Sequence, residues 1–96
     1  MAMNQVYRRR DDIVVRRVAD QTLLVPIRGR LADMQRVYAL DGVAELIWQS
    51  LDGRQDMMEI LQAIMTQFAV TADEAGQDLH RFVDRLLAAD LIVEVT

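Results

Sequence analysis

The spacing of hydrophobic and polar residues changes near residue 40. Before that point, short β-branched or alternating segments predict three strands, over residues 13–18, 21–27 and 35–40. Two residues separate the first two segments, so we expect these strands to form a β-hairpin. Because Pro26 has no backbone N–H to donate, the second strand should end there or lie at a sheet edge.

After residue 40, apolar residues recur at the spacing of an α-helix. This pattern predicts three helices, over residues 42–51, 57–68 and 72–89. Asp41 stands at the N-cap of the first helix, and segments 56–59 and 71–74 have the spacing of capping boxes. Residues 52–53, Asp-Gly, offer a left-handed turn after the first helix, and residues 91–95 predict a final strand or an extended end.

Three strands followed by three helices predict an α+β fold with a three-stranded antiparallel sheet. Three short helices beside a β-hairpin are also typical of a winged helix-turn-helix-like domain. The chain has 96 residues, of which 52% are hydrophobic, and this suits one core and one domain. Residues 1–7 show no clear period, so we expect a flexible N-terminal tail there and the domain over residues 8–96. The only tryptophan, Trp48, has the spacing of a core residue in the first helix.

Charge is distributed unevenly along the chain. Residues 1–40 contain eight Arg and four Asp, a charge of +4, whereas residues 41–96 contain three Arg and eleven acids, a charge of −8. The arginines at 8–10 suggest a winged-helix DNA-binding protein as an alternative function, but two aspartates follow them directly. Nucleic acid is also disfavoured because the last helix carries acidic residues that would repel phosphate: Asp73, Glu74, Asp78 and Asp84.

The sequence contains little catalytic chemistry. It has no cysteine and a single histidine, His80, so we expect no metal site. It also lacks the GxSxG, HExxH, Walker A and GxGxxG patterns, so we expect a protein that is not an enzyme and uses no cofactor. The absence of cysteine, of a long apolar run and of a signal-peptide core predicts a cytoplasmic location without membrane association.

The remaining features predict a binding module. A three-stranded sheet has two edges, and an exposed edge strand can accept an extended peptide as an added strand. Phe82 lies at the margin of the apolar stripe of the last helix, with Asp78 and Arg85 one step further round, where they could line a groove. An unfilled edge could also pair with a second copy of the chain, so a homodimer is an open alternative.

The segment at residues 40–53, LDGVAELIWQSLDG, resembles the signature of the PqqD family. That family typically shows Leu-Asn, a small residue, Ile-Trp and a closing Leu-Asp-Gly. This chain has Ile47-Trp48 and Leu51-Asp52-Gly53, with Asp41 in place of the commoner Asn. The resemblance extends over residues 8–95, although Asp90 stands where a Gly is common before the closing Leu-Ile.

The resemblance implies a peptide-recognition domain with the winged helix-turn-helix-like fold. In the family, such a domain binds a ribosomally made precursor peptide and presents it to a radical-SAM enzyme, as in pyrroloquinoline quinone biosynthesis. The peptide adds to the third strand and lies against the third helix, which correspond here to residues 35–40 and 72–89. The backbone of residues 36–38 would pair with the peptide. The peptide-binding residues implied are Arg36, Val37, Tyr38, Asp78, Arg81, Phe82, Arg85 and Leu86.

Overall fold

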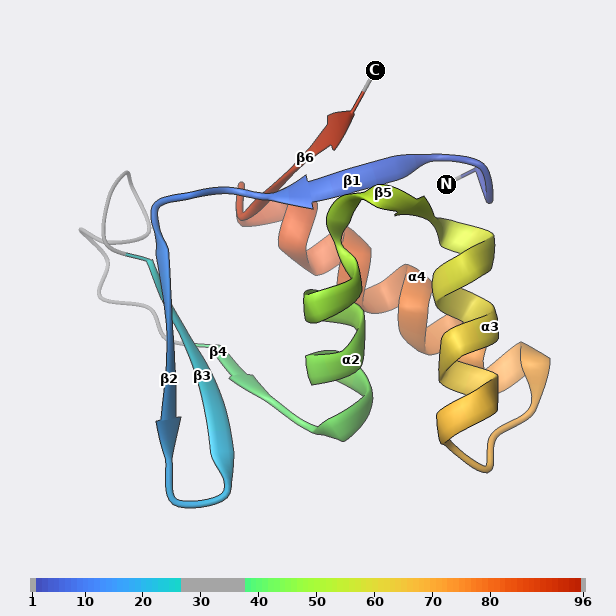
Figure 1. The fold of residues 1–96 in the computed structure, drawn as a ribbon, viewed down its shortest axis with the longest axis horizontal. Coiled ribbons are helices and arrows are strands. Elements are labelled where there is room, and N and C mark those ends of the chain that lie inside the picture. Colours follow the sequence, from blue (N-terminus) through green and yellow to red (C-terminus); the bar gives the residue numbers. More distant parts are fainter. Residues whose placement is uncertain (1, 27–37, 96) are drawn as a thin grey trace.

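The computed structural model describes residues 2–26 and 38–95. In this part of the chain, two small antiparallel sheets lie beside three helices (Figure 1). This arrangement confirms the predicted α+β fold with a three-stranded antiparallel sheet and three helices. The predictions for residues 27–37, including the start of the third strand, lie outside the described residues. No helix in the described ranges is long and apolar enough to span a membrane.

The first sheet, called here the hairpin sheet, consists of β2 (Ile13–Val18), β3 (Gln21–Pro26) and β4 (Tyr38–Leu40) in the order β2-β3-β4. Val18 pairs with Gln21, so the predicted β-hairpin is confirmed. Thr22, Leu24 and Leu40 are buried on the inner face of the sheet. Because buried residues alternate with more exposed ones along β3, one face of the hairpin sheet packs against the core.

The second sheet, called here the terminal sheet, has the order β5-β1-β6 and joins three distant segments: β5 (Asp52–Asp56), β1 (Val6–Arg9) and β6 (Ile92–Val95). Only β6 was predicted. The expected tail over residues 1–7 differs from the structure at Val6 and Tyr7, which lie in β1. Tyr7 is buried, and the carbonyl oxygen of Gln5 accepts a 3.1 Å bond from the amide of Met57.

The helices are α2 (Gly42–Ser50), α3 (Met57–Gln67) and α4 (Ala72–Ala88), each within one residue of its predicted bounds. Asp56 and Glu59 form the predicted capping box, because each side chain accepts from the backbone amide of the other residue. In the second predicted box, the hydroxyl of Thr71 accepts from the amide of Glu74 at 3.1 Å. Local side-chain chemistry thus sets where the helices begin.

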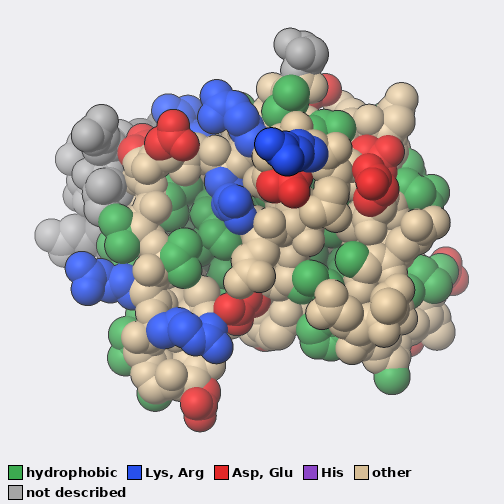
Figure 2. All heavy atoms as spheres, viewed as in Figure 1, with side chains coloured by type: hydrophobic (Ala, Val, Ile, Leu, Met, Phe, Trp, Pro, Cys, Tyr) green, Lys and Arg blue, Asp and Glu red, His purple; other side chains and the backbone are tan. Residues whose placement is uncertain are grey.

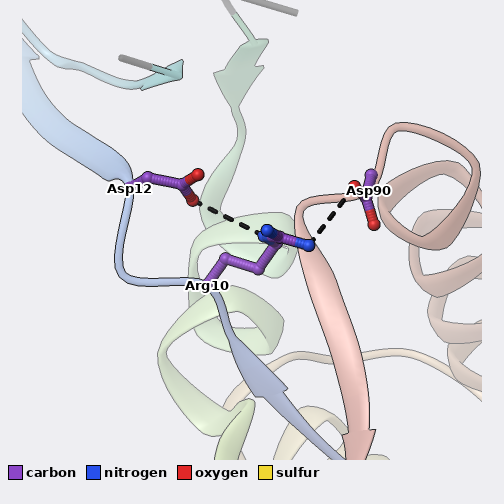
Figure 3. A network of polar contacts seen from close by, with 3 residues as sticks. All are labelled: Arg10, Asp12 and Asp90. Atoms are coloured by element: carbon purple, nitrogen blue, oxygen red, sulfur yellow. Dashed lines mark hydrogen bonds and ion pairs between the residues drawn. The ribbon is translucent and has the colours of Figure 1, made fainter. Parts of the chain in front are cut away.

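The core lies between the helices and the inner faces of both sheets. Trp48 is buried there, as predicted, with 4% of its surface exposed. Where the chain leaves β1 for β2, Arg10 binds the carboxylates of Asp90 at 3.3 Å and Asp12 at 3.6 Å (Figure 3). Its backbone amide also donates to the carbonyl of Leu91 at 3.0 Å. These contacts hold the connection between the two sheets against the end of α4.

Candidate functional site

A hollow of about 150 Å³ lies between the beginning of α2 and the middle of α4. We call it the α2–α4 hollow. Its apolar lining comes from both helices, and charged side chains also contribute. The lining residues are Asp41, Val43, Ala44, Ile47, Asp78, Arg81 and Phe82. The hollow thus combines a largely aliphatic wall with two carboxylates and one guanidinium.

The α2 side of this hollow is positioned by the short path from β4 into α2. Leu40 is buried at the end of β4, and Asp41 follows immediately as the N-cap, accepting a 2.8 Å hydrogen bond from the amide of Ala44. No linker separates strand and helix, so the first turn of α2 lies next to β4. The spacing of Val43, Ala44 and Ile47 then places all three on one side of α2.

The α4 side is positioned by the burial of one stripe of the helix. Ala75, Leu79, Val83 and Leu86 are buried in this stripe. Asp78 and Phe82 are four residues apart and so lie on one face at its margin, with Arg81 next to Phe82. Phe82 is half-buried and packs against the core, while Asp78 and Arg81 are exposed. The helix therefore offers an aromatic surface flanked by opposite charges.

The strand β4 supplies an edge beside these helices. Its register pairs Thr22 with Leu40 and Leu24 with Tyr38, and β3 is its only strand partner among residues 2–26 and 38–95. Tyr38 is half-buried against the core and Ala39 is exposed. Backbone groups on the outer side of such an edge strand can pair with another extended chain.

The structure brings together three of the eight predicted site residues, Asp78, Arg81 and Phe82, in the lining of one hollow. Tyr38 lies in β4, and Arg85 is exposed on α4 outside that lining. Arg36 and Val37 lie outside the described residues. Leu86 is placed differently from the expectation: only 1% of it is exposed, because it belongs to the centre of the buried stripe. It supports α4 and offers no contact surface.

Four lining residues were not predicted as site residues: Asp41, Val43, Ala44 and Ile47. Asp41 was predicted as a helix cap, and the other three belong to the apolar repeat that predicted the first helix. One signal in the sequence could have identified these residues. The first helix directly follows the third predicted strand, which places the first turn of that helix beside the edge of the strand.

The chemistry of the hollow suits binding of an extended segment with an apolar side chain. The carboxylate of Asp41 already accepts from the amide of Ala44, which leaves Asp78 and Arg81 to interact with a ligand. His80 pairs with Asp84 at 3.0 Å, and neither residue lines the hollow. Within the described ranges, His, Cys, Asp and Glu form no cluster of three that could hold a metal ion.

Two side chains with displaced pKa values lie in or beside the terminal sheet and not in the hollow. Burial raises the pKa of Tyr7. Hydrogen bonds from the backbone amides of Gln55 and Arg54 lower the pKa of Asp52 to about 2. Both shifts follow from the local structure of this sheet, and we assign neither residue to ligand binding.

Comparison with known proteins identified one family and a recurring fold. The sequence model of the family described as coenzyme PQQ synthesis protein D (PqqD) matches residues 21–92. This range contains β3, β4, α2, α3 and α4, and therefore includes both sides of the α2–α4 hollow. No curated protein matches the chain.

Two solved structures share the fold. "TbiB1 in Complex with the TbiA(beta) Leader Peptide" is 22% identical with a TM-score of 0.71, covering 93% of this chain and 98% of that chain. "Lasso peptide synthetase B1 complexed with the leader peptide" is 20% identical with a TM-score of 0.73, covering 91% of this chain and 96% of that one. At these identities the likeness is one of fold.

Proposed function

This chain belongs to the PqqD family, and from that membership we propose that it is a recognition element that binds a ribosomally made precursor peptide. The observation that carries the proposal is the α2–α4 hollow beside the outer edge of β4. The two proteins with the same fold are described as complexes with leader peptides, which supports a peptide as the ligand class.

The peptide is expected to bind as an extended strand along β4. Backbone groups of β4 supply the pairing, and the prediction that residues 36 and 37 also pair lies outside the described residues. Side chains of an added strand alternate between two faces, so every second peptide residue points toward the helices. One such apolar side chain enters the hollow and contacts Phe82, Val43 and Ala44, which are half-buried. Main-chain pairing provides affinity, and the hollow provides selectivity.

Charged residues on α4 set the register of the peptide. Asp78 and Arg81 are exposed and line the hollow, so they favour a basic and an acidic peptide residue, respectively, on the two sides of the apolar anchor. Arg85 lies one turn beyond Arg81 on the exposed surface of α4 and extends this charged row. A peptide shifted by one residue would turn its anchor side chain away from the hollow.

The domain's role is non-catalytic: it holds the precursor and presents it to a radical-SAM enzyme, as in pyrroloquinoline quinone biosynthesis. Membership of the PqqD family supports this pathway class. The lining of the hollow also supports it, because it contains groups suited to holding an extended chain and no pairing of a nucleophile with a base. The modification chemistry would therefore belong to the enzyme.

The direct test is an NMR titration of the ¹⁵N-labelled domain with a short precursor peptide encoded beside its gene. We expect the largest amide shifts at Tyr38–Leu40, Ala44 and Phe82. Phe82→Ala should weaken binding about ten-fold, because it removes an aromatic contact surface worth roughly 1.4 kcal/mol or more. Leu87→Ala is the matched control, because Leu87 is 38% exposed on the same helix and does not line the hollow.

A melting curve of each variant shows whether it is folded at the titration temperature. Shifts confined to residues outside β4, the first half of α2 and α4 would contradict the proposed site. Equal loss of affinity in Phe82→Ala and Leu87→Ala, with both variants folded, would contradict the role of the hollow.

A further inference from the structure

A second hollow, of about 200 Å³, lies on the other side of α2. We call it the hairpin hollow. The hairpin β2–β3 forms one wall, the end of β1 another, and α2 the third. The lining residues that matter here are Arg9, Ile13, Val15, Thr22, Glu45 and Trp48. Figure 2 shows hydrophobic side chains between the hairpin and α2, with arginines beside them.

The two hollows share α2 but no lining residue. Val43, Ala44 and Ile47 face the α2–α4 hollow, whereas Glu45 and Trp48 face the hairpin hollow. The helical spacing of 100° per residue separates the mean directions of these two sets by about 120° around α2. A ligand in one hollow therefore leaves the other accessible.

The floor of the hairpin hollow is apolar and incompletely covered. Val15 is 51% exposed although it lies on the inner face of the hairpin sheet, opposite Leu24 in the register. Ile13 is half-buried on the same face, and Trp48 closes the bottom. The hairpin thus stands off α2 far enough to leave room for a side chain from another molecule.

Two arginines flank this floor and have hydrogen-bonding capacity to spare. Nη1 of Arg9 donates to the carbonyl oxygens of Trp48 at 3.0 Å and Gln49 at 3.1 Å. Nη1 of Arg17 donates to the hydroxyl of Thr22 at 2.8 Å and to the carboxylate of Glu45 at 2.9 Å. All four of these bonds use Nη1. The Nε and Nη2 atoms of both side chains can therefore donate to a further acceptor.

The charge of the hollow selects the sign of its ligand. Its charged lining consists of Arg9, of Arg10, which binds Asp12 and Asp90, and of Glu45, which Arg17 neutralises. Within the described residues, Arg9 is therefore the lining cation that no carboxylate neutralises. Arg9 also lies over the Trp48 ring, 6.0 Å from its centroid, so its guanidinium is held next to the apolar floor. A guanidinium fixed in this way is suited to bidentate binding of a carboxylate.

We propose that the hairpin hollow docks an acidic segment of a partner protein in which carboxylates flank an aliphatic or aromatic side chain. The apolar side chain occupies the space above Val15 and Trp48, and the carboxylates bind Arg9 and Arg17. Because the α2–α4 hollow stays open, the domain can hold this partner and a peptide at the same time.

The test uses two blocked hexapeptides as probes, Glu-Asp-Leu-Phe-Asp-Glu and its charge-reversed counterpart Lys-Arg-Leu-Phe-Arg-Lys. The acidic probe should shift the amides of Val15 and Thr22 and the indole N–H of Trp48 in ¹⁵N spectra of the full chain. The basic probe should bind at least five-fold more weakly. Equal binding of both probes, or shifts centred on Ala44 and Phe82, would overturn the proposal.

Two substitutions in one strand provide the matched comparison. Val15→Asp places a carboxylate in the hollow and should weaken the acidic probe at least ten-fold. Val18→Asp should change its affinity less than two-fold, because Val18 is 57% exposed on the opposite face of β2. Both side chains are already exposed, so both variants should fold. Equal effects of the two substitutions would contradict the assignment.

Sedimentation of the chain over a range of concentrations tests whether a second copy of the chain occupies the hairpin hollow. A dimer that Val15→Asp abolishes would assign the hollow to a second copy and overturn the proposal. A monomer in both cases agrees with it. Val15→Asp should leave the precursor titration unchanged, so failure at the hairpin hollow is distinguishable from failure at the α2–α4 hollow.

Discussion

The two sheets of this domain differ in how far apart in the sequence their strands lie. The hairpin sheet joins neighbouring segments, with Val18 paired to Gln21 across a two-residue turn. The terminal sheet joins β1, β5 and β6, which come from the beginning, the middle and the end of the chain. Alternating apolar residues mark the first sheet, whereas β5 has the polar sequence DGRQD. The hairpin sheet, whose outer edge is proposed to bind the peptide, is therefore encoded locally, whereas the terminal sheet forms only when the rest of the fold is in place.

This difference predicts that the two sheets can be perturbed separately. The edge proposed to bind the peptide belongs to the hairpin sheet, while the terminal sheet brings the two ends of the domain together. Damage to the terminal sheet should therefore reduce the free energy of unfolding and spare peptide affinity in the molecules that remain folded.

The largest effect is expected from Tyr7→Ala in β1. Tyr7 is 4% exposed, and removing a buried aromatic ring costs about 3 kcal/mol or more of the free energy of unfolding. Urea denaturation measures this loss, and Tyr7→Phe is the control because it retains the ring. Precursor affinity of the folded fraction should change less than two-fold. Loss of binding in a folded Tyr7→Ala variant would show that the two sheets are not separable.

A smaller effect is expected at Gly53 in β5. Its φ is 82°, and an added Cβ would lie 3.3 Å from the Cβ of Arg8. Gly53→Ala should therefore lower the free energy of unfolding by about 1–2 kcal/mol. Gly76→Ala should raise it by about 0.5–1 kcal/mol, because Gly76 lies inside α4 with open space around it. If urea denaturation showed that both glycine substitutions change the free energy of unfolding in the same direction, this explanation would be wrong.

The smallest effect is a pH dependence that arises at the beginning of β5. Amide donors of Gln55 and Arg54 lower the pKa of Asp52 from 3.8 to about 2 in the folded chain. The carboxylate therefore stabilises the fold above about pH 4, and this contribution is lost as the pH falls toward 2. Because Asp52 is exposed, solvent screens the interaction and the effect is small.

Asp52→Asn should flatten the stability profile between pH 4 and pH 2, since the amide oxygen still accepts but does not titrate. Urea midpoints at several pH values measure this. Asp20→Asn, in the exposed turn of the hairpin, provides the comparison from the other sheet. If Asp52→Asn lost as much stability between pH 4 and pH 2 as the wild type, Asp52 would not be the cause of that loss.

Most of the fold could be predicted because its signals are local. The side chains of Asp41, Asp56 and Thr71 cap the three helices as their positions in the sequence indicated. The strands β1 and β5 could not be predicted in the same way. Their pairing depends on partners more than forty positions away, such as Val6 with Asp56 and Val6 with Val95. Spacing along the chain carries no information about such partners.

The candidate site was predicted in part for the same reason. Helical spacing placed Asp78 and Phe82 on one face of α4, and both line the α2–α4 hollow in the structure. The opposite wall, with Ala44 and Ile47, depends on how α2 packs against α4, which no spacing within one helix reveals. Leu86 was predicted to provide an apolar contact for the peptide, but it is buried in the stripe of α4 with Leu79 and Val83.

The pairing of β1 with β6 has a consequence for the order of folding during synthesis. Arg9 pairs with Ile92 and Val6 with Val95, so β1 must wait for residues more than eighty positions further along the chain. The hairpin and α2 can form earlier, because their contacts are closer in sequence. The nascent chain would therefore expose the edge proposed to bind the peptide before its terminal sheet closes, and completing β6 would be the step that commits the domain to its stable state.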